Sequence, residues 1–457
     1  MKKHITGSLA ATAALLAIAG IAQAAPAELN IFGASAQYTY WNDQAQNYAQ
    51  NNLGCTNVSA PVNNGGKHGF VSAKDCTSTL VPRNADNGNK RDLDIRYSGI
   101  ASAEGVLAIK KEVPLDPSLA NGCDTTKGER LMYNSDSTLV CKQVHIGTSD
   151  VAGESLLQSS SGNKFGPMGG GAFSPVNAPI DTSSLTPANT VIVPFGFFVN
   201  KNVKASTCTT GLVGQYCTTN AHCKLNDGTA GVCGTAATIT NISREEANLI
   251  FSGYVSNWSD LGAYFTNQDV TACLRHAGSG THAALDLTVM NSVWGSNMVS
   301  ADDDPTAAPH IWFNQGSSDE IKCVNGNSTT NPDGALIGAI GYADGDQATN
   351  VAKTSQNVAP VKYNGQFPTR TAIRNGQYDF YTNAWLYTNP ANISTVVEPV
   401  QYDVNALAAN MVIYAQNPAH VPDAKANYWA ATGEMKFNRA EETSYPAFVG
   451  ASNPMLP

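Results

Sequence analysis

The sequence has 457 residues, 42% of them hydrophobic, and a formal net charge of -9 at neutral pH. A chain of this length is more than one hydrophobic core usually serves, so we expect at least two domains. Its acidity argues against nucleic-acid binding, because phosphodiester backbones are bound by clusters of Lys and Arg. A small anion remains an admissible ligand, since such a site depends on local dipoles and one or two buried cations.

The first 24 residues have the pattern of a secretory signal peptide. Lys2 and Lys3 precede an apolar run at 9–21, and Ala-Gln-Ala at 22–24 forms a cleavage site. The run is short for a membrane span, and no other stretch approaches the roughly 18 apolar residues that a span needs. We therefore expect a mature protein without a membrane anchor, either periplasmic or secreted.

After the signal peptide, strand, turn and helix patterns alternate. Residues 29–34 predict a buried strand running into a glycine turn, and Tyr38, Trp41, Ala45 and Tyr48 then fall at helical spacing. These residues predict the first strand–helix unit.

Two further strand-and-turn patterns follow. Residues 94–99 predict a strand and residues 102–109 a helix, with Ser102 as its expected N-cap. Residues 144–150 predict a short strand that ends in a polar turn.

The second half of the chain continues the alternation. The segment 158–190 is rich in Ser, Gly, Pro and Asn and is expected to be a mobile loop before a buried strand at 191–199. Ser243 and Glu246 predict a capping box at a helix start, and residues 337–342 predict another buried strand. The alternation predicts an α/β protein with mainly parallel sheets, in which ligands bind beyond the strand ends.

Residues 275–281 read Arg-His-Ala-Gly-Ser-Gly-Thr and precede a predicted helix. The glycines let the backbone approach a ligand, and the first helical turn offers free N–H groups and a positive dipole end. The hydroxyls add donors, and the planar Arg275 fork matches two oxygens of one anion. Taken alone, the run fits a plain capped turn equally well.

Eight of the ten cysteines lie in three polar, glycine-rich segments, 51–92, 118–141 and 204–236, which we expect to be surface insertions. An even count in an exported chain indicates disulfides. The expected pairs are Cys55 with Cys76, Cys123 with Cys141, and Cys273 with Cys323. For the cysteines between Cys208 and Cys233, zinc binding with His222 is an alternative to disulfides.

Four turns resemble, in order, those of the phosphate-binding proteins that serve ABC transporters, a branch of the type II periplasmic-binding-protein fold. They are residues 33–38 (Gly-Ala-Ser-Ala-Gln-Tyr), 99–105 (Gly-Ile-Ala-Ser-Ala-Glu-Gly), 147–150 (Gly-Thr-Ser-Asp) and 275–281. The resemblance implies a two-lobe α/β fold, and it covers most of the mature chain outside the disulfide-stapled insertions. The lobes would comprise 25–194 with 380–457, and 195–379.

The resemblance also implies the ligand, the partner and the site. The ligand would be inorganic phosphate or a similar tetrahedral oxyanion, held between the lobes, and the partner an ABC transporter permease. No cofactor, metal or catalytic residue is implied. The residues carried over as ligand contacts are Gln37, Tyr38, Ser102, Asp150, Arg275, Ser279, Gly280 and Thr281.

Asp150 carries the expected selectivity. A carboxylate repels an anion unless the anion has a proton to donate, so Asp150 favours hydrogenphosphate over sulfate. Three positions depart from the family pattern: Gln37 replaces a small hydroxyl residue, Tyr38 replaces Phe, and Glu104 replaces Gly. We expect Glu104 to point outward and satisfy the helix dipole.

Two other functions stay open. One is an extracellular or surface interaction protein in which the insertions bind a partner, and the other is a phosphatase-like enzyme. No nucleophile and base occur at a suggestive spacing, so His145, His276 and His282 are expected to be structural. The acidic run 302–304 is expected to be a solvated loop.

Overall fold

The computed structural model describes residues 26–64, 67–83, 88–156, 176, 178–292, 296–299, 308–326, 337–353, 357–392, 395–397 and 400–449. The signal peptide, most of the 158–190 segment and the acidic run 302–304 lie outside the described residues, so these expectations stay predictions. Among the described residues, no helix has the length and apolar composition needed to cross a membrane.

The first lobe is built on a mixed sheet whose centre is parallel. Strand β1 pairs in parallel with β5 on one side and with β8 on the other. The strands are, in spatial order, β2 (Asn57–Val58), β4 (His68–Lys74), β5 (Leu93–Gly99), β1 (Ala27–Gly33), β8 (Ile146–Ser149) and β19 (Tyr381–Thr388), with β3 (Val62–Asn64) beside β4.

The second lobe also has parallel pairs at its centre. Strand β15 lies between β16 and β17 and is parallel to both. Its strands are β16 (His310–Asn314), β15 (Thr271–Arg275), β17 (Ala339–Asp344), β18 (Val358–Tyr363) and β14 (Asn241–Ile242).

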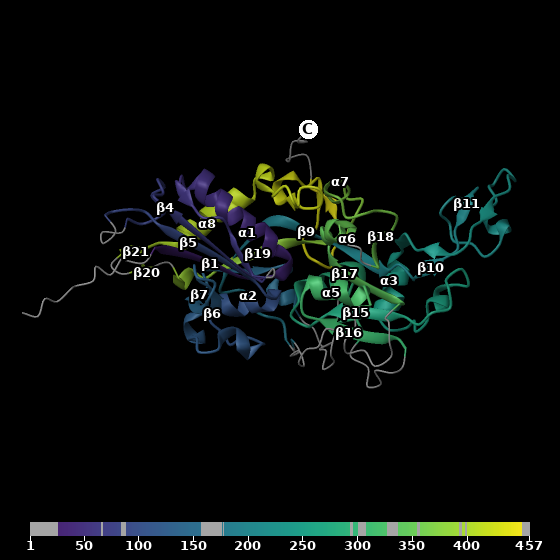
Figure 1. Ribbon diagram of the computed structural model, residues 1–457, viewed down its shortest axis with the longest axis horizontal. Helices are drawn as coiled ribbons and strands as arrows, with labels where there is room; N and C mark the ends of the chain where they lie inside the picture. The colour runs from purple at the N-terminus through teal and green to yellow at the C-terminus, as the bar shows by residue number, and fades with distance from the viewer. Residues whose placement is uncertain are drawn as a thin grey trace, which may run out of the picture.

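One long strand, β9 (Thr186–Asn200), belongs to both lobes (Figure 1). It pairs with β19 as far as Pro194, and with β17 and β18 from Phe195 onward. At the same point the Phe195 N–H donates to the Phe380 carbonyl at 3.1 Å. The two chain crossings between the lobes, at Phe195 and at Phe380, therefore lie side by side. That the two lobes are independent domains stays a prediction.

Helices cover both faces of the first lobe. In Figure 1, α1 (Tyr38–Asn47) and α8 (Val404–Ala415) lie above its sheet and α2 (Ser102–Ile109) lies below. Gly105 makes the close approach of α2 possible, because a β-carbon there would lie 2.4 Å from the Thr148 carbonyl oxygen. The other helices are α3 (Arg244–Phe251), α4 (Gly280–Ala284), α5 (Ser317–Val324), α6 (Gln347–Lys353) and α7 (Arg370–Arg374).

Several local predictions are confirmed. Tyr38, Trp41 and Ala45 in α1 and Tyr48 in the helical turn that follows it are buried, as expected. The capping box before α3 is present, with the side chains of Ser243 and Glu246 each accepting from the other's backbone N–H. These signals are local in sequence, which is why they can be interpreted without the fold.

Two predictions about the sheets are wrong. Antiparallel pairs outnumber parallel ones in the large sheet, because β9 and β19 run against their neighbours and β4 is antiparallel to β2, β3 and β5. The segment 51–92 is not only a surface insertion, since β4 forms a ladder with β5 and buries Phe70, Val71 and Ala73.

All ten cysteines form disulfides, with none free. The three predicted pairs are confirmed, and the remaining cysteines pair as Cys208–Cys223 and Cys217–Cys233. Because these sulfurs are oxidised, the zinc alternative is wrong. The α/β two-lobe fold with disulfide-bonded insertions is thus confirmed.

The insertions and the C-terminal segment add short two-stranded pairs to this core. The insertion at 204–236 extends away from the second lobe at the right of Figure 1. The pairs are β6 (Glu129–Tyr133) with β7 (Leu139–Gln143), β10 (Lys204–Ala205) with β13 (Ala237–Thr238), β11 (Cys208–Thr210) with β12 (Val232–Cys233), β20 (Thr395–Val397) with β21 (Val400–Tyr402), and β23 (Phe437–Asn438) with β24 (Ala447–Phe448), and β22 (Ala430–Ala431) pairs with β9.

Candidate functional site

The fold brings three predicted residues of the first lobe together at the ends of its parallel strands. Asp150 follows β8 and is 1% exposed. Its Oδ1 accepts a hydrogen bond from Gln37 Nε2 at 3.0 Å, and its Oδ2 accepts one from Ser102 Oγ at 3.5 Å. The Asp150 N–H in turn donates to Ser102 Oγ at 3.0 Å. Both carboxylate oxygens therefore have donors from within the protein.

Gln37 is held from both ends of its side-chain amide. Its Nε2 also donates to the Ser149 carbonyl at 3.0 Å, and its Oε1 accepts from Trp41 Nε1 at 2.8 Å. The side chain is fully buried. Rotation of Gln37 away from Asp150 would break these bonds inside the protein, so its position is fixed.

Ser102 does not act as the expected N-cap. The N-cap of α2 is Ala101, and Ser102 is the first helical residue. Its hydroxyl is used by Asp150 instead of by the helix N-terminus. The residue is at the predicted place with a different local role.

The second lobe contacts this cluster through its glycine turn. A β-carbon at Gly280 would lie 2.2 Å from Ser102 Oγ and 2.7 Å from Asp150 Cβ. Close by, the Ala103 N–H donates to the Gly278 carbonyl at 3.0 Å. The turns from the two lobes are therefore in direct contact, and glycine is required for this approach.

Arg275 ends β15 and is fully buried between the lobes. It donates to the hydroxyls of Thr281 at 3.4 Å, Ser317 at 3.2 Å and Ser35 at 3.3 Å, and to the Gln315 carbonyl at 2.7 Å. Each of these partners is neutral. The carboxyls of Asp150 and Glu320 interact with the charge of Arg275, but neither accepts a hydrogen bond from it among the described contacts.

Two buried donors of the 275–281 turn lack a hydrogen-bond partner among the described residues. They are the Arg275 Nε and the hydroxyl of Ser279. Ser279 is the N-cap of α4 but makes no side-chain capping bond. Donors without acceptors in the interior cost free energy, and they are typical of places where another group binds.

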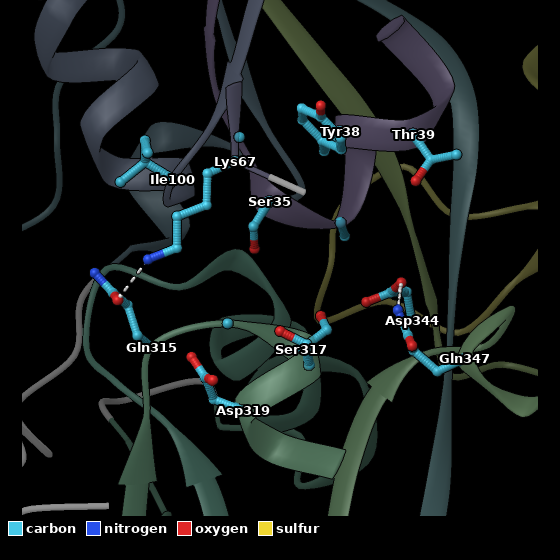
Figure 2. Close-up of a pocket in the computed structure, with 14 residues that line it drawn as sticks. Ser35, Tyr38, Thr39, Lys67, Ile100, Gln315, Ser317, Asp319, Asp344 and Gln347 are labelled. Atoms are coloured by element: carbon cyan, nitrogen blue, oxygen red, sulfur yellow. Dashed lines mark hydrogen bonds between the residues drawn. The ribbon is translucent and has the colours of Figure 1, made fainter. Parts of the chain in front are cut away.

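A cavity of about 150 Å³ opens between the lobes next to this cluster (Figure 2). Lys67 reaches across it, and its Nζ donates to Gln315 Oε1 at 3.0 Å. The lining residues from the first lobe are Ser35, Ala36, Tyr38, Thr39, Lys67, Gly99 and Ile100, and those from the second are Gln315, Gly316, Ser317, Ser318, Asp319, Asp344 and Gln347.

Of the predicted site residues, Tyr38 alone lines this cavity. Its hydroxyl donates to the His68 carbonyl at 2.9 Å, so the hydroxyl proton is already used within the first lobe. Ser35 and Ser317 line the cavity and also contact Arg275. The structure thus places a hydroxyl from each lobe between the buried guanidinium and the cavity.

Sequence reasoning missed Ser317, Lys67 and Asp344 as cavity residues. Ser317 opens α5 directly after a strand, a position that a turn reading Gly-Ser-Ser-Asp could have signalled. Lys67 lies in a segment interpreted as an insertion, and Asp344 ends a strand identified only by its apolar part. Their proximity depends on lobe packing, which local patterns do not contain.

Burial raises the pKa of Asp150 to about 6 and that of Glu320 to about 8. For Asp150, the Gln37 hydrogen bond opposes this effect, whereas the charge of Asp344 adds to it. For Glu320, the charge of Arg275 opposes it. Burial therefore favours the protonated form of Glu320 at neutral pH, whereas Asp150, which also interacts with the charge of Arg275, is mostly ionised there.

Glu320→Gln should remove one component of the pH dependence of stability. The folded pKa of Glu320 is about 8 and its ordinary value is 4.5, so the folded state binds more protons between these values. The free energy of unfolding then falls as pH rises through this window, by about 1.4 kcal/mol per unit from this group. Urea unfolding of both proteins at pH 5, 6 and 7 measures the difference in slope, and equal slopes would contradict the assignment.

Glu104 does not point outward as expected. It is 3% exposed, its Oε1 accepts from the Asp116 N–H at 3.0 Å, and burial raises its pKa to about 7. The adjoining 115–116 loop covers it, which the helix pattern alone could not reveal. Glu104 thus holds this loop rather than satisfying the helix dipole from solvent.

The three histidines near the turns are buried. His145 Nδ1 accepts from the Asn30 N–H at 3.2 Å, and His282 Nδ1 lies 2.8 Å from the Tyr342 hydroxyl. His276 Nδ1 lies 2.6 Å from the Ala277 carbonyl. Burial lowers the pKa of His145 and of His276 to about 4. The expectation that they are structural residues accords with these contacts.

No family model matches the chain, and no curated protein matches it. Solved structures that it resembles include an ABC-type phosphate transport receptor from Vibrio cholerae, at 12% identity and a TM-score of 0.40 over 86% of this chain and 94% of that one. A phosphate-binding protein from Stenotrophomonas maltophilia aligns at 14% identity and a TM-score of 0.39, over 85% and 90%. At these values the likeness does not identify a ligand for this chain.

Proposed function

We propose that this protein is an exported solute-binding protein that captures a tetrahedral oxyanion, inorganic phosphate first among them, between its two lobes for ABC-type uptake. The observation that carries the proposal is Arg275, a fully buried cation whose described hydrogen-bond partners are all neutral and come from both lobes. An anion beside this group would compensate its charge.

The geometry supports capture by closure of the lobes. Ser35 belongs to the first lobe, Arg275 and Ser317 to the second, and the anion would hold them together. Charge-assisted hydrogen bonds contribute roughly 1.5–3 kcal/mol each, so a few of them can offset the desolvation of a small anion. Binding and lobe closure would then be one event.

The disulfides support export. All ten cysteines are paired, and such pairing is maintained in oxidising compartments. Together with the signal-peptide pattern, this favours a periplasmic or secreted location. The permease would be a membrane partner of the closed form. Catalysis is not part of the proposal.

Thermal unfolding tests the proposal. The mature chain, refolded from denaturant to strip bound anions, should melt at a higher temperature in phosphate than in chloride of equal ionic strength. At a free ligand concentration of 100 Kd, binding adds about 2.7 kcal/mol to the free energy of unfolding. An unchanged melting temperature at millimolar phosphate and sulfate would overturn the proposal.

A further inference from the structure

Asp150 is surrounded by protein groups from both lobes. Gln37 donates to one carboxylate oxygen and Ser102 to the other. Gly280 packs against the Asp150 β-carbon from the opposite lobe. Asp150 is 1% exposed and does not line the cavity.

This enclosure changes what the carboxylate can recognise. A carboxylate selects a protonated anion because it needs a donor and would otherwise repel the ligand. Here the Gln37 amide is that donor, at 3.0 Å, and it is fixed by Trp41 and Ser149. The Gln37 hydrogen bond does not remove the charge of the carboxylate, but both of its oxygens have protein donors and Asp150 does not line the cavity, so the carboxylate is not placed to accept a proton from a ligand.

We propose that Gln37 is a specificity-determining residue that abolishes the requirement for a proton on the bound anion, so the site accepts sulfate as well as phosphate. This inference rests on the proposed function and narrows it to tetrahedral oxyanions regardless of their protonation. The charged groups that face Asp150 from the second lobe are Arg275 on β15 and Asp344 on β17. Among the described contacts, neither Arg275 nor Asp344 forms a hydrogen bond with the Asp150 carboxylate.

Gln37→Ser tests the inference. Serine removes the long amide and frees Asp150 Oδ1. Calorimetric titrations of the refolded mature chain with sodium phosphate and with sodium sulfate give the ratio of the two affinities. We expect the ratio to lie within about tenfold in the wild type and to shift toward phosphate by about tenfold or more in the variant.

A control variant separates a general packing effect from the loss of the donor. Gln44→Ser makes the same change on α1, where Gln44 bonds the His420 carbonyl outside the cleft, and should leave the ratio unchanged. Phosphate bound about a hundredfold more tightly than sulfate by the wild type would overturn the inference and leave the proposed function standing. Binding of neither anion would overturn both. If Gln37→Ser fails to fold, the wild-type ratio decides alone.

Discussion

Replacing Arg275 with Met should weaken phosphate binding by about a hundredfold or more, which corresponds to about 3 kcal/mol. Methionine keeps an unbranched side chain but removes the buried charge and all four of its donated hydrogen bonds. An anion in the cleft would then be desolvated without a compensating cation. Calorimetric titration of the refolded variant measures the loss.

Two further variants define what Arg275 contributes. Arg275→Lys keeps the charge and loses the planar fork, so its affinity should fall between those of the wild type and the Met variant. Lys127→Met removes a cation from the surface, where Lys127 pairs with Asp124, and should not change binding. Near wild-type affinity in Arg275→Met would remove this residue from the site.

Gly280→Ala should weaken anion binding by about tenfold or more, because it opposes closure of the lobes. The new methyl group would lie 2.2 Å from Ser102 Oγ and 2.7 Å from Asp150 Cβ, so the turns must separate. Arg275 and the Ser35 hydroxyl would move apart with them. Isothermal titration reports the affinity, and small-angle scattering reports the separation of the lobes.

The clash has a specific partner, which gives a rescue experiment. Ser102→Ala removes the oxygen nearest to the new methyl group, so the double variant should recover part of the affinity lost in Gly280→Ala. Gly433→Ala is the matched control, since its nearest contact is the Gln416 carbonyl at 3.8 Å. Equal affinity of Gly280→Ala and the wild type would show that this contact is not needed for binding.

The sequence predicted those parts of the fold that depend on neighbours in the chain. The helix at Tyr38, the strand before it and the capping box at Ser243 all follow from short periodic patterns. The edge strand β4 was missed, because polar and glycine-rich flanks make its segment look like a loop. Its pairing with β5 is a contact between distant residues, and local patterns do not specify such contacts.

The candidate site, like the fold, was predicted only in part. The turns that carry Ser102, Asp150 and Arg275 were predicted to converge, and the structure brings them to one interface between the lobes. The sequence could not show that the Gln37 amide donates to the Asp150 carboxylate, because this contact depends on the rotamer and the burial of the amide. Nor could it show that Ser317 joins the Arg275 cluster, because α5 and β15 meet only through the second sheet.

A crystal structure of the refolded mature chain with arsenate tests the central claim most directly, because arsenic gives an anomalous signal that locates the anion. We predict one strong peak between the lobes, within hydrogen-bond distance of Arg275 or of the Ser35 and Ser317 hydroxyls to which Arg275 donates. Peaks confined to surface lysines, or none at a millimolar concentration of arsenate, would contradict it.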